Sequence, residues 1–116
     1  MNDENFGCYF KYLRKSKKIT QDQVATYVGR NKMTISLIEN NKNEPPNGKL
    51  LTKMIESLSL DNQKEVSKLY LLASKQRKTL PVDIEEYFFS HEEIYNSILR
   101  GMKKNKNNKD WENIFK

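Results

Sequence analysis

The stretch from Thr20 to Asn41, TQDQVATYVGRNKMTISLIENN, constrains the fold more than any other part of the sequence. Its apolar residues recur at helical spacing on both sides of Gly29, so it predicts two short helices joined by a tight turn. Gly29 lies where the chain must reverse and is expected to adopt a positive φ, because it has no Cβ. Thr20 and Asn31 are suited to begin the two helices, since each side chain can accept a hydrogen bond from a first-turn N–H.

The second predicted helix separates its residues onto two faces. Ile35 and Ile38 are expected to face the core, where the small Ala25 of the first helix allows a close crossing. The remaining positions carry Lys32, Met33, Thr34, Ser36 and Leu37. This is the layout of a helix-turn-helix, which places its second helix in the major groove of DNA. An ordinary helical hairpin is the alternative interpretation.

Over about residues 6–60 the sequence resembles the Cro/cI-like, or XRE-type, repressor family. FGCYFKYLRKSKKIT is similar to the family's first helix, TQDQVATYVG to its second and NKMTISLIEN to its recognition helix. The resemblance implies a lambda-repressor-like five-helix domain in which Arg14 pairs with Glu39.

Two positions depart from the family pattern. Asn41 replaces the usual Gly after the recognition helix, and Asn is the next-best residue for a left-handed conformation. Arg30 occupies a position that is usually apolar. We expect it to lay its stem on the core and to turn its guanidinium toward solvent or a phosphate.

The helix-turn-helix assigns expected DNA contacts to particular side chains. Lys32 can donate to guanine O6 and N7, while Met33 and Leu37 can touch thymine methyl groups. The full set expected to contact bases is Lys32, Met33, Thr34, Ser36 and Leu37. The set expected to contact phosphates is Gln21, Arg30, Asn31, Asn40, Asn41 and Lys42. Structural roles are expected for Arg14, Glu39, Ala25 and Gly29.

The rest of the chain predicts more helices, so the expected fold class is all-α. Apolar spacing predicts helices over 48–58 and from Asp61 to about 77, and another element begins at Leu80-Pro81. Ser90–Glu93 has the S-x-x-E pattern of a capping box that begins a further helix. The expected division is a helix-turn-helix domain (1–60), a helical extension that serves as a dimerisation module (61–102), and a basic linker with a short C-terminal helical turn (103–116).

The charge is distributed unevenly along the chain. The net charge is +6, and residues 1–58 hold ten Lys or Arg against six Asp or Glu. Residues 59–102 hold six against seven, and residues 103–116 hold five against two. Positive charge on the helix-turn-helix half and on the tail is expected for contact with phosphates. The tail also carries Trp111 and Phe115, which are expected either to dock on a subunit or to bind a partner.

Composition bounds the setting and the chemistry. The single cysteine, Cys8, cannot form an internal disulfide and suggests a reducing cytoplasm. The sequence contains no run of about 18 apolar residues, so no membrane span is predicted, and the N-terminus has no signal pattern. With one His and one Cys, no catalytic constellation, metal-ligand spacing or phosphate-binding glycine loop is present in the sequence. We therefore expect neither an enzyme nor a cofactor.

Together these patterns predict a sequence-specific regulator of transcription that binds double-stranded DNA. The expected form is a homodimeric repressor on a pseudo-palindromic operator, because two copies related by a two-fold axis read two half-sites. One alternative is an antitoxin that regulates its own operon and binds a toxin through its C-terminal part. Another is a protein–protein interaction module without a role on DNA. A toxin or an antirepressor would be the protein partner of the C-terminal segment.

Overall fold

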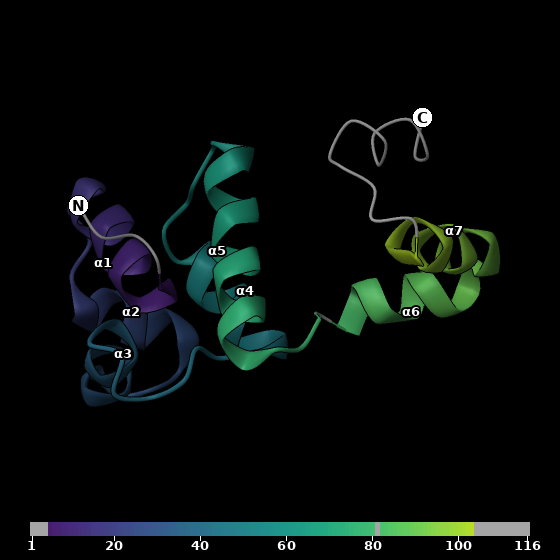
Figure 1. Cartoon of the computed structure of the whole chain (residues 1–116). Coiled ribbons are helices and arrows are strands. Elements are labelled where there is room, and N and C mark those ends of the chain that lie inside the picture. The colour runs from purple at the N-terminus through teal and green to yellow at the C-terminus, as the bar shows by residue number, and fades with distance from the viewer. Residues whose placement is uncertain (1–4, 81, 104–116) are drawn as a thin grey trace. The chain divides into compact units, whose positions relative to one another are not determined.

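The computed structural model describes residues 5–80 and 82–103, and within this part the chain forms seven helices and no strand (Figure 1). The prediction of an all-α fold is confirmed. The helices are α1 (Phe6–Ser16), α2 (Gln21–Val28), α3 (Lys32–Glu39), α4 (Gly48–Glu56), α5 (Gln63–Arg77), α6 (Val82–Ser90) and α7 (Glu92–Lys103). None of these described helices has the length and apolar character needed to cross a membrane. The chain divides between residues 81 and 82 into two compact units.

The core of the first unit is built from all five of its helices. Helix α1 packs against α3 and α5, α2 packs against α3 and α4, and α4 packs against α5. Each helix is too short to be stable alone, so the shared core holds all five in place. The buried apolar side chains of this core are Phe6, Tyr9, Phe10, Leu13, Val24, Ala25, Val28, Ile35, Ile38, Leu51, Met54, Ile55, Leu58, Leu69, Leu72 and Ala73.

Side-chain caps set the beginnings of α2 and α3. The hydroxyl of Thr20 accepts a hydrogen bond from the Gln23 N–H at 3.0 Å, and the Gln23 amide oxygen accepts one from the Thr20 N–H at 2.8 Å. This reciprocal pair is a capping box. Asn31 accepts a hydrogen bond from the Thr34 N–H at 2.9 Å. Gly29 between the helices has φ of 73°. The caps and the left-handed turn expected from the sequence are confirmed.

Helix α3 ends in a Schellman motif centred on Asn41. The Asn41 N–H donates to the Ile38 carbonyl at 3.1 Å, and the Lys42 N–H donates to the Leu37 carbonyl at 2.9 Å. Asn41 has φ of 59°, in the left-handed region where Asn is tolerated. The exchange of Gly for Asn at this position therefore preserves the turn that leads out of α3.

Helix α5 completes the first unit and does not belong to a separate extension. It begins at Gln63 after the cap Asn62, one residue later than the expected cap Asp61. Its apolar stripe, with Leu69 and Leu72, is buried against the unit's core. The division into compact units falls between residues 81 and 82, so α5 lies in the same unit as the predicted helix-turn-helix domain. Helix α5, the next helix along the chain, packs against α1 and α4 and so buries their apolar faces.

The second unit pairs α6 with α7. The predicted capping box at its turn is wrong, because the Ser90 hydroxyl donates to the Glu86 carbonyl of its own helix at 2.9 Å. The ring of the next residue, His91, stacks on that of Tyr87, with ring centroids 3.9 Å apart. The expected basic linker and terminal turn, with Trp111 and Phe115, lie outside the described residues apart from Lys103, which ends α7.

Candidate nucleic-acid interface

One face of α3 is buried and the opposite side is open to solvent. Ile35 and Ile38 lie in the core, which fixes how the helix is rotated on its axis. Met33 in the first turn is 69% exposed, and Lys32 beside it is also exposed. Leu37, one turn later, is half-buried. Helix α3 therefore presents a mixed apolar and basic surface at its first turn, where a recognition helix reaches deepest into a groove.

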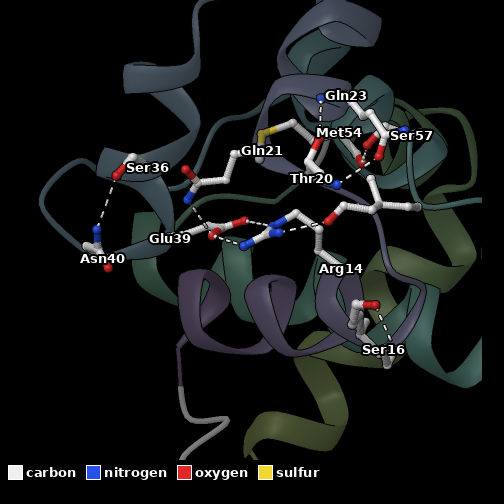
Figure 2. A network of polar contacts seen from close by, with 12 residues as sticks. Arg14, Ser16, Thr20, Gln21, Gln23, Ser36, Glu39, Asn40, Met54 and Ser57 are labelled. Atoms are coloured by element: carbon white, nitrogen blue, oxygen red, sulfur yellow. Dashed lines mark hydrogen bonds and ion pairs between the residues drawn. The ribbon is translucent and has the colours of Figure 1, made fainter.

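The two hydroxyl groups expected to contact bases take part in local contacts. Thr34 donates its hydroxyl proton to the Asn31 cap at 3.0 Å. Ser36 accepts a hydrogen bond from the Asn40 side-chain amide at 3.3 Å (Figure 2). Both Thr34 and Ser36 are half-buried. Their hydrogen-bonding capacity is thus partly used inside the protein, in contrast to that of Lys32.

A buried ion pair holds α1 to the end of α3. Arg14 donates to both carboxylate oxygens of Glu39, from Nε at 2.6 Å and from its terminal nitrogen at 2.9 Å (Figure 2). Its other terminal nitrogen donates to the Ile19 carbonyl at 2.8 Å. This is the pairing that the family resemblance implies. Burial of the two charges costs desolvation free energy, and the bidentate hydrogen bonds between them offset that cost.

Gln21 extends this network toward the surface. Its side-chain amide donates one hydrogen bond to Glu39 at 2.9 Å (Figure 2). A Gln amide has two N–H donors, and the contact to Glu39 uses one of them. The network therefore orients the side chain of Gln21 at the start of α2.

The other residues expected to contact phosphates lie at both ends of α3. Asn31, Asn40 and Lys42 are exposed. Arg30 is also exposed, and its guanidinium donates to the Gly29 carbonyl at 3.3 Å. Asn41 is exposed, but its side-chain oxygen accepts a hydrogen bond from Gln76 of α5 at 3.0 Å. The structure thus gives Asn41 a contact within the first unit, and its contact with DNA stays a prediction.

Three features of this region were not expected from the sequence. A Cβ on Gly7 would overlap the carbonyl oxygen of Ile38, so Gly7 is what lets α1 approach the end of α3. Gln76 accepts a hydrogen bond from the Phe6 N–H at 2.6 Å while it donates to Asn41. Asp22 lies 3.9 Å from Lys32. The close approach at Gly7 could have been predicted, because a glycine inside a predicted helix often indicates close packing.

Comparison with known proteins agrees with this geometry. Residues 10–59 match the Helix-turn-helix family. The N-terminal part of the chain is therefore a helix-turn-helix domain of the XRE type, and the resemblance inferred from the sequence is confirmed.

Two curated relatives come from Bacillus subtilis strain 168. The HTH-type transcriptional repressor RghR is 39% identical over 57 residues, which are 49% of this chain and 42% of RghR. The uncharacterized HTH-type transcriptional regulator RghRB is 26% identical over 117 aligned positions, which cover 96% of this chain and 81% of RghRB. This chain thus spans less than half of the first relative and most of the second. No solved structure gives a significant match.

Proposed function

We propose that this chain is a sequence-specific DNA-binding regulator of transcription that acts as a homodimeric repressor. In this proposal α3 enters the major groove and Gln21 meets a phosphate at the start of α2. Two copies read the two halves of a pseudo-palindromic operator. The naming of both relatives as regulators of transcription, one of them a repressor, supports the class of function.

The observation that carries the proposal is the outward face of α3. Met33, a large apolar side chain, is 69% exposed beside Lys32, whereas Phe10 and Met54 of the same domain are fully buried. An exposed Met in the first turn suits contact with thymine methyl groups, and a neighbouring Lys suits guanine. The buried Ile35 and Ile38 hold this face in one orientation.

Selection of bound duplexes from a random pool tests the proposal as a whole. We expect the full chain to enrich duplexes with two related half-sites about one helical turn apart. Half-sites with that spacing would indicate both sequence specificity and a two-fold pair of subunits. A pool that shows no enrichment, together with no salt-dependent binding to any duplex, would overturn the proposal and favour a protein–protein module.

Two lysine variants separate base contacts from phosphate contacts. Lys32→Ala should cost ~1–3 kcal/mol of binding free energy on the selected site and relax the base preference there. Lys42→Ala should weaken binding to selected and random duplexes alike and lower the salt slope by about one. Lys64→Ala on α5 is the matched control, since it removes the same exposed charge outside the helix-turn-helix. Equal losses on both kinds of duplex for Lys32→Ala would contradict its assignment to a base.

A further inference from the structure

Helix α7 carries an apolar stripe that its own unit leaves open. Tyr95, Leu99 and Met102 are spaced i, i+4 and i+7, so they lie on one face of the helix. They are 44%, 41% and 60% exposed. Three large apolar side chains in a row on one helix are more than the scattered exposed residues of an ordinary surface. We therefore expect another polypeptide surface to pack against this stripe.

The neighbouring face of α7 is the one that α6 covers. Ile94 and Ile98 are half-buried and Gly101 is buried, and α6 is the helix that packs against α7. At about 100° per residue, Ile94 and Ile98 lie to one side of Tyr95 around the helix. The exposed stripe is thus distinct from the contact between α6 and α7, and it is not left open by poor packing of that contact.

The charges of α7 are separated along its length. Glu92 and Glu93 lie in the first turn, and Arg100 and Lys103 lie in the last. At about 100° per residue, Glu92 and Lys103 both fall roughly 60–80° from Tyr95, on the side away from Ile98. One border of the stripe is therefore acidic at its beginning and basic at its end.

We propose that the occupant is a second copy of the chain, whose α7 packs antiparallel against this α7 across a two-fold axis near Leu99. In this arrangement Tyr95 meets Met102 of the partner subunit, and Glu92 meets Lys103 of the partner subunit. The contact is self-complementary, as a two-fold interface requires. The opposed helix dipoles also favour an antiparallel pair.

Charge complementarity favours the antiparallel direction of pairing over the parallel one. In a parallel pair the two-fold axis runs along the helices, so the Glu92–Lys103 border of one α7 lies on the opposite side of the interface from that of its partner and the two charges make no contact. An antiparallel pairing turns the same residues into two attractive contacts. The pairing follows from α7 alone, whereas its use in reading two half-sites rests on the proposed function.

The first test is the association state of the full chain without DNA, measured by sedimentation. We expect a dimer at micromolar concentration, and we expect Leu99→Asp to be monomeric because it buries a charge at the axis. Leu71→Asp is the matched control, since Leu71 on α5 is 54% exposed and lies in the other unit. Circular dichroism should show the helices of both variants intact. A native chain that stays monomeric at tens of micromolar overturns the proposal.

A charge exchange tests the antiparallel direction. Glu92→Lys and Lys103→Glu should each raise the dimer dissociation constant about three- to tenfold, because each contact occurs twice by symmetry. The double variant should recover the native constant. Both substitutions oppose the helix dipole, so recovery cannot come from a more stable helix. A double variant that associates more weakly than either single variant overturns the antiparallel pairing.

Binding to DNA distinguishes a failure of the pairing from a failure of the proposed function. Leu99→Asp should bind a duplex with one half-site as the native chain does, and should lose the extra affinity for a duplex with two. If the native chain dimerises but binds no duplex, the pairing stands and the proposed function fails. If Leu99→Asp binds both duplexes as the native chain does, the dimer is not what reads the two half-sites.

Discussion

The two units of this chain differ in where their apolar side chains lie. The first unit buries large side chains from five helices, together with the Arg14–Glu39 ion pair. Among residues 83–103 of the second unit, the buried residue is Gly101, while Phe89 is 77% exposed and Met102 is 60% exposed. The first unit can thus hold a binding surface in place by itself. Because helices of 9 and 12 residues are marginal alone, the second depends more on what covers it.

Glu39→Ala is expected to have the largest effect on the difference in stability between the two units. The substitution leaves the Arg14 guanidinium buried without its carboxylate and removes the acceptor of Gln21. The first unit should lose about 3–5 kcal/mol of unfolding free energy. Urea denaturation followed by circular dichroism measures this loss. DNA binding per folded molecule should largely survive, because Glu39 is buried away from the outer face of α3, and any loss should be limited to the ordering of Gln21.

Glu56→Ala is the control for this prediction, since Glu56 is an exposed carboxylate on α4 of the same unit. It should change the unfolding free energy by no more than about 0.5 kcal/mol. Equal losses for Glu39→Ala and Glu56→Ala would mean that the buried pair contributes nothing particular to the first unit.

A smaller effect is expected from Gly7→Ala. The added Cβ would overlap the Ile38 carbonyl oxygen and lie 2.7 Å from that of Glu39, and backbone atoms cannot rotate away. Displacement of α1 from α3 should cost about 1–3 kcal/mol, which outweighs the better helix propensity of Ala. Thermal unfolding checks the loss. Cys8→Ala at the next, half-buried position should be nearly neutral, and an equally stable Gly7→Ala would show that the two helices can separate without cost.

The sequence predicted the parts of the molecule that are set locally. The caps at Thr20 and Asn31, the left-handed Gly29 and the inward Ile35 and Ile38 depend on residues a few positions apart. Such local patterns carry their own physical signal. The placement of the proposed contact residues on the outer part of α3 follows from the same periodicity.

The long-range features could not be predicted in this way. The spacing of apolar residues in α5 shows that one face must be buried, but not whether α1 and α4 or a second subunit covers it. For the same reason the contact of Gln76 with Phe6, 70 positions away, has no local signature. At Ser90 a local pattern was misleading, because the hydroxyl could also bond to the carbonyl four residues earlier, and that contact is the one formed.

The smallest effect on the first unit is expected from Phe88→Ala in the second. Phe88 is half-buried on α6, and its loss should loosen the α6–α7 pair and weaken dimerisation. Amide hydrogen exchange in α1–α5 should change by less than about 0.5 kcal/mol, because sites without shared partners act independently. Phe10→Ala, in the core of the first unit, should instead cost about 3–5 kcal/mol there. If Phe88→Ala lowers protection throughout α1–α5, the two units unfold as one, and the helix-turn-helix relies on the second unit for its stability.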